Sequence, residues 1–128
     1  MADTSKKTVL LIEDDLFLSQ LLTTRLQRVG INVLKVFDGE AAINTLKDTK
    51  PDLILLDIIL PKKSGFEVME EINSNPMLKD GPIIVISNLG QEADVARGKA
   101  LGAVEYLIKA QTGIDDLVEK IKSFLEKS

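Results

Sequence analysis

The sequence has no cysteine and no histidine, and aromatic residues make up only 4% of its 128 residues. The absence of cysteine excludes disulfides and thiolate metal sites. The absence of histidine excludes imidazole catalysis and histidine metal ligands. A cysteine-free chain fits a reducing compartment, and we expect a cytoplasmic protein.

An excess of basic residues and a long apolar run are also missing. The net charge is −4 and the pI is near 4.9, so no basic stripe offsets repulsion by phosphate groups. Residues 1–9, MADTSKKTV, lack the apolar core of a signal peptide. No run reaches the roughly 18 apolar residues of a membrane span. We therefore expect neither nucleic acid nor a membrane as a partner.

The chain is instead rich in aliphatic residues, and its apolar content of 45% is enough for one domain with a sizeable core. Five short apolar runs alternate with segments of helical spacing. The runs expected to form strands are Thr8–Ile12, Asn32–Val36, Leu53–Leu56, Ile83–Ile86 and Val104–Ile108. This alternation predicts a single α/β domain of the (βα)5 type, with a doubly wound parallel sheet covered by helices on both faces. We place an N-terminal tail at residues 1–7 and the domain at residues 8–127.

Local signals predict where the helices begin and end. Ser64 and Glu67 have the spacing of a capping box. The fourth helix, near residues 91–101, contains Gly98 and should be the weakest. The expected caps are Gly30 at the end of the first helix, Asp38 at the start of the second, Ser64 of the third and Thr112, with Asp115, of the fifth.

Polar side chains follow four of the predicted strands. Glu13-Asp14-Asp15 follow the first, Asp57 the third, Ser87-Asn88 the fourth and Lys109 the fifth. The carboxyl ends of parallel strands meet at one edge of the sheet, where such folds bind ligands. Two carboxylates about 4 Å apart repel by roughly 4 kcal/mol at an effective dielectric constant near 20. The acidic cluster therefore needs a counterion, and Mg²⁺ prefers such oxygen ligands.

Each of these groups also has a simpler interpretation. The three acids can stabilise a helix N-terminus, Ser87 can be a turn residue, and Lys109 can be a solvated surface lysine. Tyr106 can simply pack on an edge strand. The coincidence of four such groups at four strand ends favours a shared site. A carboxylate, a cation, an ammonium group and a hydroxyl are what the transfer of a phosphoryl group requires.

Four segments carry a resemblance to a known family. VLLIEDD, DLILLDIILPKKSGFEV, PIIVIS and GAVEYLIK together resemble the receiver domain of bacterial two-component response regulators. The resemblance covers essentially the whole sequence, and the combined motifs are specific. It implies the flavodoxin-like strand order 2-1-3-4-5. It also implies that Asp57 accepts a phosphoryl group from a histidine and that Lys109 pairs with the phosphoryl oxygens.

The resemblance implies further roles at the same site. Ser87 and Tyr106 match the switch residues that move with phosphorylation, and Asp15 is expected to cap the first helix outside the metal shell. The implied ligands of Mg²⁺ (or Mn²⁺) are Asp14, Asp57, the backbone carbonyl of Ile59 and, through water, Glu13.

Two positions depart from the family pattern, and two others beside the site bear on how long a phosphoryl group would persist. Ala110 follows Lys109 where the family usually has a proline in a cis peptide. A cis bond before a residue other than proline costs about 3–4 kcal/mol, so we predict a trans bond. Asn88 stands where the family favours a small residue, and it should narrow access to Asp57. Ile59 and Leu89 flank the site and are both apolar. We therefore expect slow autodephosphorylation and restricted access for small phosphodonors.

The leading hypothesis is a stand-alone phosphorylation switch with no output domain after Ser128, and with no enzymatic activity beyond self-directed phosphoryl transfer. Its expected partners are a sensor histidine kinase or a histidine phosphotransfer protein, and an unknown target protein. We expect the target to bind the face made by the fourth helix, the fifth strand and the fifth helix, and the protein to be a monomer or weak dimer.

Three alternatives remain open. The first is a receiver-like interaction scaffold that is never phosphorylated. An aspartyl-phosphate hydrolase normally has an acid two residues after its nucleophile, where this chain has Ile59. A flavin-binding flavodoxin needs a hydroxyl- and glycine-rich phosphate loop after the first strand, where this chain has Glu13, Asp14 and Asp15.

Overall fold

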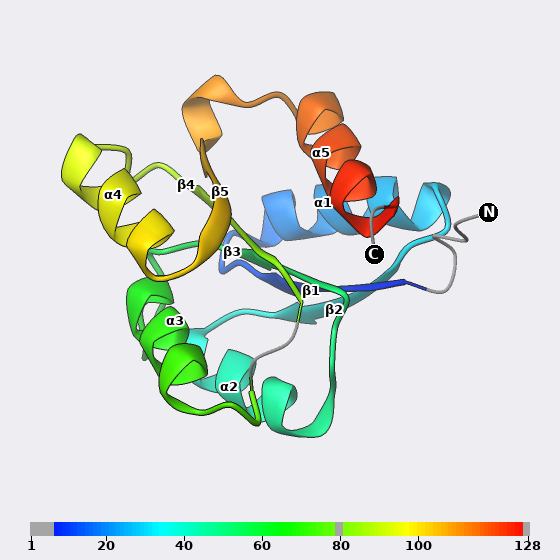
Figure 1. Ribbon diagram of the computed structural model, residues 1–128. Coiled ribbons are helices and arrows are strands. Elements are labelled where there is room, and N and C mark those ends of the chain that lie inside the picture. Colours follow the sequence, from blue (N-terminus) through cyan, green and yellow to red (C-terminus); the bar gives the residue numbers. More distant parts are fainter. Residues whose placement is uncertain (1–6, 79–80, 127–128) are drawn as a thin grey trace.

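The computed structural model describes residues 7–78 and 81–126. Its strands form a five-stranded parallel sheet of order β2-β1-β3-β4-β5 (Figure 1). Along the chain the elements are β1 (Thr8–Ile12), α1 (Leu16–Arg28), β2 (Asn32–Val36), α2 (Gly39–Asp48), β3 (Leu53–Leu56), α3 (Gly65–Ser74), β4 (Ile83–Ser87), α4 (Glu92–Ala100), β5 (Ala103–Ile108), a 3₁₀ turn η2 (Lys109–Gln111) and α5 (Ile114–Glu126). The predicted (βα)5 fold and strand order are confirmed.

Helices cover both faces of the sheet because its central strands are apolar on both faces. Helices α1 and α5 lie on one face, and α2, α3 and α4 lie on the other (Figure 1). Alternate residues of β1 enter the two cores: Leu10 and Ile12 join the core under α2 and α3, and Val9 and Leu11 join the core under α1 and α5. All four residues of β3, Leu53–Leu56, are fully buried. Asp57 follows directly, so its carboxylate lies at the end of the central strand and not within it.

Most of the predicted caps are confirmed. Asp38 caps α2, and Ser64 and Glu67 form the complete capping box of α3. Helix α1 ends at Arg28 with Val29 as its C-cap, so the predicted cap Gly30 lies one residue further on. Its φ of 84° is a left-handed conformation that glycine adopts without strain, as is usual at this position after a helix.

The prediction for the last helix was wrong. Helix α5 begins at Ile114, so Gly113 and not Thr112 stands at the position before its first residue. The Thr112 hydroxyl donates instead to the Ile108 carbonyl oxygen at 2.9 Å. This bond spans four residues and ties Thr112 back to the end of β5 across the turn η2.

The ends of the predicted domain fall partly outside the described residues. Of the predicted tail, residues 1–7, only Lys7 is described, and residue 127 at the end of the predicted domain also lies outside. Among the helices of the described segments, none has the length and apolar character needed to cross a membrane.

Candidate functional site

The carboxyl ends of β1 and β3 bring three acidic side chains together. Carboxylate oxygens of Glu13, Asp14 and Asp57 all lie within 4.8 Å of one another. Glu13 is fully buried, Asp57 is 4% exposed, and Asp14 is exposed to solvent. The backbone N–H of Asp57 donates to the Ile12 carbonyl at 3.0 Å, which extends the β1–β3 pairing by one residue. The position of Asp57 therefore follows from the parallel pairing of two buried strands.

Lys109 neutralises part of this charge from the end of β5. Its Nζ atom lies 2.7 Å from Oδ2 of Asp57, and 2.9 Å and 3.1 Å from the two carboxylate oxygens of Glu13. Burial lowers the pKa of Lys109, but the hydrogen bonds to Asp57 and Glu13 outweigh it, so the net pKa is raised. Lys109 therefore stays protonated and presents its charge to both acids.

The loop after β3 holds the Asp57 carboxylate from its other side. The backbone N–H of Ile59 donates to Oδ1 of Asp57 at 3.2 Å. Gly65 permits this compact loop, because a Cβ atom at that position would lie 2.4 Å from the backbone oxygen of Asp57. The Ile59 side chain is 58% exposed. One oxygen of Asp57 thus bonds to a backbone amide and the other to an ammonium group, so the carboxylate is oriented.

Glu13 shows that the site carries more negative charge than its protein partners balance. Its Oε2 atom accepts hydrogen bonds from the Asp15 N–H at 3.0 Å and from Lys109. Its Oε1 atom is buried and accepts no well-aligned hydrogen bond from the described residues, although Lys109 Nζ is close. Burial raises the pKa of Glu13 to about 7, and Asp57 adds to the rise, against the opposing effect of Lys109.

These features fit a hard divalent cation. The site offers only oxygen ligands, one of its buried carboxylate oxygens lacks a hydrogen bond, and the cluster is short of positive charge. Mg²⁺ and Mn²⁺ both prefer such donors. Asp15 does not belong to this group of three, since its Oδ1 atom accepts the N–H groups of Phe17 and Leu18 as the N-cap of α1, as predicted.

Ser87 and Tyr106 form a second group, joined through the backbone of Leu89. The Leu89 N–H donates to Ser87 Oγ at 3.2 Å, and the Tyr106 hydroxyl donates to the Leu89 carbonyl. Ser87 is fully buried and Tyr106 is 8% exposed, so the ring points inward. Burial raises the pKa of the Tyr106 phenol, with further contributions from Asp94 and Asp57. Leu89, in the loop after β4, therefore links the Ser87 hydroxyl at the end of β4 to the Tyr106 side chain on β5.

Asn88 and Ala110 contact each other, which the sequence did not reveal. The Ala110 N–H donates to Oδ1 of Asn88 at 3.2 Å across 22 residues. The described residues contain no cis peptide bond. The predicted trans bond between Lys109 and Ala110 is therefore confirmed. Asn88 and Ala110 are the two departures from the family pattern, and the fold joins them by this hydrogen bond.

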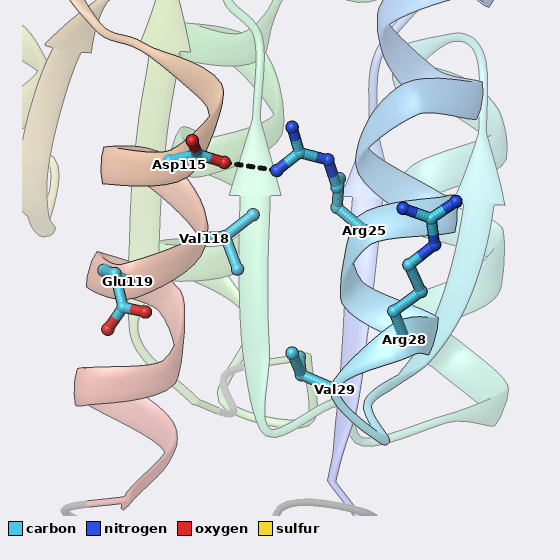
Figure 2. Close-up of a pocket in the computed structure, with 6 residues that line it drawn as sticks. All are labelled: Arg25, Arg28, Val29, Asp115, Val118 and Glu119. Atoms are coloured by element: carbon cyan, nitrogen blue, oxygen red, sulfur yellow. Dashed lines mark hydrogen bonds and ion pairs between the residues drawn. The ribbon is translucent and has the colours of Figure 1, made fainter.

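A pocket of about 390 Å³ lies elsewhere, between α1 and α5. Figure 2 shows Arg25 and Asp115 facing each other across it as an ion pair. Its lining residues are Arg25, Arg28, Val29, Asp115, Val118 and Glu119. None of these belongs to the acidic cluster or contacts Lys109 in the described structure, so the hollow is separate from the candidate site.

Comparisons of the sequence place this geometry in a family. The family model described as "Response regulator receiver domain" matches residues 9–122. The chain is 38% identical over 120 residues to the "Transcriptional regulatory protein CpxR" of Klebsiella pneumoniae, covering 94% of this chain and 50% of that protein. It is 36% identical over 120 residues to the protein of the same name from Escherichia coli, with the same coverage. The chain thus spans about half the length of these curated relatives.

Comparisons of the structure agree. The chain resembles the Mn²⁺-bound form of response regulator Rcp1 with a TM-score of 0.83 and 34% identity, covering 95% of this chain and 96% of that one. It resembles a two-component response regulator from Clostridium difficile with a TM-score of 0.85 and 27% identity, covering 94% and 96%. The chain belongs to the response regulator receiver domain family.

Proposed function

We propose that this receiver domain is the phosphoacceptor of a histidine-to-aspartate phosphorelay, and that Asp57 is the residue phosphorylated. The observation that supports this most strongly is the position of Asp57. Its carboxylate is nearly buried at the end of the central strand, within 4.8 Å of two other acids and 2.7 Å from Lys109. These 128 residues contain no histidine, so the donor phosphohistidine lies outside them. The proposed donor is a sensor histidine kinase or a histidine phosphotransfer protein.

The proposed transfer is a displacement at phosphorus. A carboxylate oxygen of Asp57 forms a bond to phosphorus, and the phosphorus–nitrogen bond of the phosphohistidine breaks with its electron pair returning to the imidazole. The product is an acyl phosphate on Asp57. Lys109 stabilises the charge on the phosphoryl oxygens, because its ammonium group already lies at hydrogen-bond distance from the nucleophile. The Ile59 N–H holds Oδ1 and thereby orients the carboxylate.

The same acids are proposed to hold the divalent cation. Asp14, Asp57 and the Ile59 carbonyl would be direct ligands of Mg²⁺ or Mn²⁺, and Glu13 would contribute through water. A bound cation would neutralise the excess negative charge and the charge of the incoming phosphoryl group. The buried Oε1 atom of Glu13, which lacks a hydrogen bond, and the Mn²⁺-bound form of a structural relative support this assignment.

Signal output is proposed to run through Ser87 and Tyr106. Phosphorylation would draw the Ser87 hydroxyl toward the phosphoryl group, and the Leu89 backbone would pass the movement to Tyr106, because Leu89 bonds to both side chains. The target would be a protein that binds α4, β5 and α5. The curated relatives are named transcriptional regulators, but this chain matches only half of each, and its net charge of −4 supports a protein partner for these residues.

The persistence of the phosphoryl group is proposed to depend on Ile59 and Leu89. Neither side chain can orient an attacking water molecule, and the exposed Ile59 lies two residues after Asp57, with its N–H bonded to Oδ1 of that residue. We expect slow autodephosphorylation, accelerated in Ile59→Asn and Leu89→Glu. Rapid loss of the phosphoryl group from the wild type, not further accelerated in these variants, would contradict this part of the proposal.

The deciding experiment is intact-mass measurement after incubation with Mg²⁺ and a phosphorylated histidine kinase. The wild type should gain the mass of one phosphoryl group, and Asp57→Asn should gain none. Asp48→Asn is a matched control, because Asp48 is an exposed aspartate at the end of α2. A wild type that gains no mass from any kinase or small phosphodonor would favour the unphosphorylated scaffold.

A further inference from the structure

Past the last paired residues of β4 and β5, one side chain continues the connection between the two strands. The backbone pairing ends with Ser87 opposite Ile108. Asn88 and Lys109 are the next residues on each strand, and Oδ1 of Asn88 accepts the N–H of Ala110 at 3.2 Å. A side chain here replaces the main-chain bond that a longer ladder would have made.

The backbone at Ala110 needs such an acceptor. The first N–H groups of a helical turn have no partner inside that turn, and η2 begins at Lys109. The closing bond of η2 runs from the Thr112 N–H to the Lys109 carbonyl, which leaves the Ala110 N–H free for Asn88. A proline at position 110 would have no N–H to donate. The acceptor on Asn88 is therefore useful only because residue 110 is not proline.

This bond acts on Lys109. On its N-terminal side Lys109 is held by β5, and on its C-terminal side the next backbone amide is held by Asn88. The Lys109 side chain extends from this backbone and places its ammonium group beside both Asp57 and Glu13. We infer that Asn88 is a positioning residue for Lys109, acting through the Ala110 amide. The Asn88 side chain makes no hydrogen bond to Asp57 or Lys109 among the described residues, so we assign it a positioning role and not a catalytic one.

This role differs from the one expected from the sequence, in which Asn88 narrows access to Asp57. The two roles predict opposite effects of Asn88→Ala on the rate of phosphorylation. If Asn88 positions Lys109, Asn88→Ala should slow phosphorylation by a small-molecule phosphodonor about 2- to 10-fold, the effect of one partly exposed hydrogen bond. If Asn88 only obstructs entry, Asn88→Ala should accelerate the reaction. A faster or unchanged Asn88→Ala overturns the inference.

A double-mutant cycle is a second test that distinguishes positioning of Lys109 from obstruction of access to Asp57. In an Ala110→Pro background the donor N–H is gone, so Asn88→Ala should have no further effect on the rate. An effect of Asn88→Ala that persists there at full size overturns the inference. Asn75→Ala is the matched control, because Oδ1 of Asn75 also accepts a backbone N–H, from Met77 at 3.1 Å, in a loop after α3. It should leave the rate unchanged.

The importance of Lys109 for transfer rests on the proposed function, so one measurement must not depend on phosphorylation. By NMR of the unphosphorylated protein, Asn88→Ala should remove the hydrogen-exchange protection of the Ala110 amide and shift the Lys109 side-chain ammonium resonance. Asn88→Asp keeps an acceptor oxygen and should retain the protection. If the ammonium resonance does not move in Asn88→Ala, the inference fails even where phosphorylation succeeds. If it moves while no phosphorylation occurs, the proposed function fails and the positioning role stands.

Discussion

The Nζ atom of Lys109 lies 2.7 Å from Oδ2 of Asp57, across 52 residues of sequence. The lysine side chain is 18% exposed and the aspartate side chain 5% exposed. Water screens the pair only weakly at this burial, so its electrostatic energy is larger than that of a surface ion pair. The ammonium group lies where the oxygens of a phosphoryl group on Asp57 would need it.

Lys109→Gln should therefore slow phosphorylation of Asp57 by about 10²- to 10³-fold, the usual loss when one charge-stabilising donor is removed. The metal-free variant should also be less stable by about 3 kcal/mol, because two buried acids lose their counter-charge. Lys120→Gln is the control: its ion pair with Glu105 has the same 2.7 Å distance, but its partners are 44% and 31% exposed. It should cost less than about 1 kcal/mol. Transfer rates and urea unfolding measure both effects, and equal losses in the two variants would contradict this account.

Glu13 predicts an unusual pH dependence of stability in the metal-free protein. Burial raises its pKa from 4.5 to about 7, so between these values the folded state binds more protons than the unfolded state. Stability contributed by this group is present below about pH 4.5 and is lost as the pH rises through about 7. Glu13→Gln lacks this loss and should exceed the wild type above pH 7 by about 2–3 kcal/mol.

Unfolding by urea at several pH values with a chelator present tests this prediction. The advantage of Glu13→Gln should shrink toward pH 5, and it should also shrink when Mg²⁺ is added, because the cation stabilises the ionised carboxylate. Glu119→Gln serves as the control, since the Glu119 side chain is 74% exposed. A constant difference between Glu13→Gln and the wild type across this pH range would show that Glu13 is ionised throughout.

Gly98 sets the inward position of Tyr106. A Cβ atom at Gly98 would lie 2.6 Å and 2.8 Å from two atoms of the Tyr106 ring. Gly98→Ala should therefore displace the ring, break its hydrogen bond to the Leu89 carbonyl, and cost about 1–3 kcal/mol despite the better helix propensity of alanine. Tyr106 is the only tyrosine and the chain has no tryptophan, so intrinsic fluorescence reports its environment directly.

Gly113→Ala is the matched control for this substitution. The nearest atom to a Cβ at Gly113 is Asp116 Oδ2 at 3.8 Å, an ordinary contact. The fluorescence of this variant should equal that of the wild type. If Gly98→Ala also leaves the fluorescence unchanged, the ring does not depend on the space at Gly98.

The capping box of α3 supports the loop that follows Asp57. The Ser64 hydroxyl accepts the Glu67 N–H at 3.2 Å, and the Glu67 carboxylate accepts the Ser64 N–H at 3.2 Å. Ser64→Ala should cost about 1 kcal/mol. Ser74→Ala, at the other end of the same helix, removes only a hydroxyl that donates to the Glu71 carbonyl, and should stay within about 0.5 kcal/mol. Equal unfolding free energies for the two variants would exclude a stabilising cap at Ser64.

The fold was predictable because its signals are local and agree with one another. The apolar runs predicted all five strands to within one residue at each end. The signal is strongest for β1, β3 and β4, because a strand buried on both faces must be continuously apolar. Asp15, Asp38 and Ser64 cap the helices that they were expected to cap, because a cap bonds to residues two or three positions away. The convergence of Glu13, Asp57 and Lys109 follows from the parallel order of the strands.

The contacts that were missed form in the turns and loops that follow strands β4 and β5. Thr112 looked like a cap from its spacing to Asp115, but η2 turns its hydroxyl back to Ile108. The joint contact of Leu89 with Ser87 and Tyr106 depends on how the loop after β4 folds against β5. Both relationships depend on the path that the backbone takes after a strand, which the residue types alone did not specify.

By itself the sequence determined the strands, most of the caps and the residue types at the strand ends, because hydrophobic periodicity and backbone capping act over a few neighbouring residues. Only the tertiary structure decided how those residues share their charge and hydrogen bonds. It placed one lysine between two buried acids, left one oxygen of Glu13 without a hydrogen bond, and paired the amide of Ala110 with Asn88. These outcomes depend on distances of about 3 Å between strand ends, which the packing of the whole sheet sets.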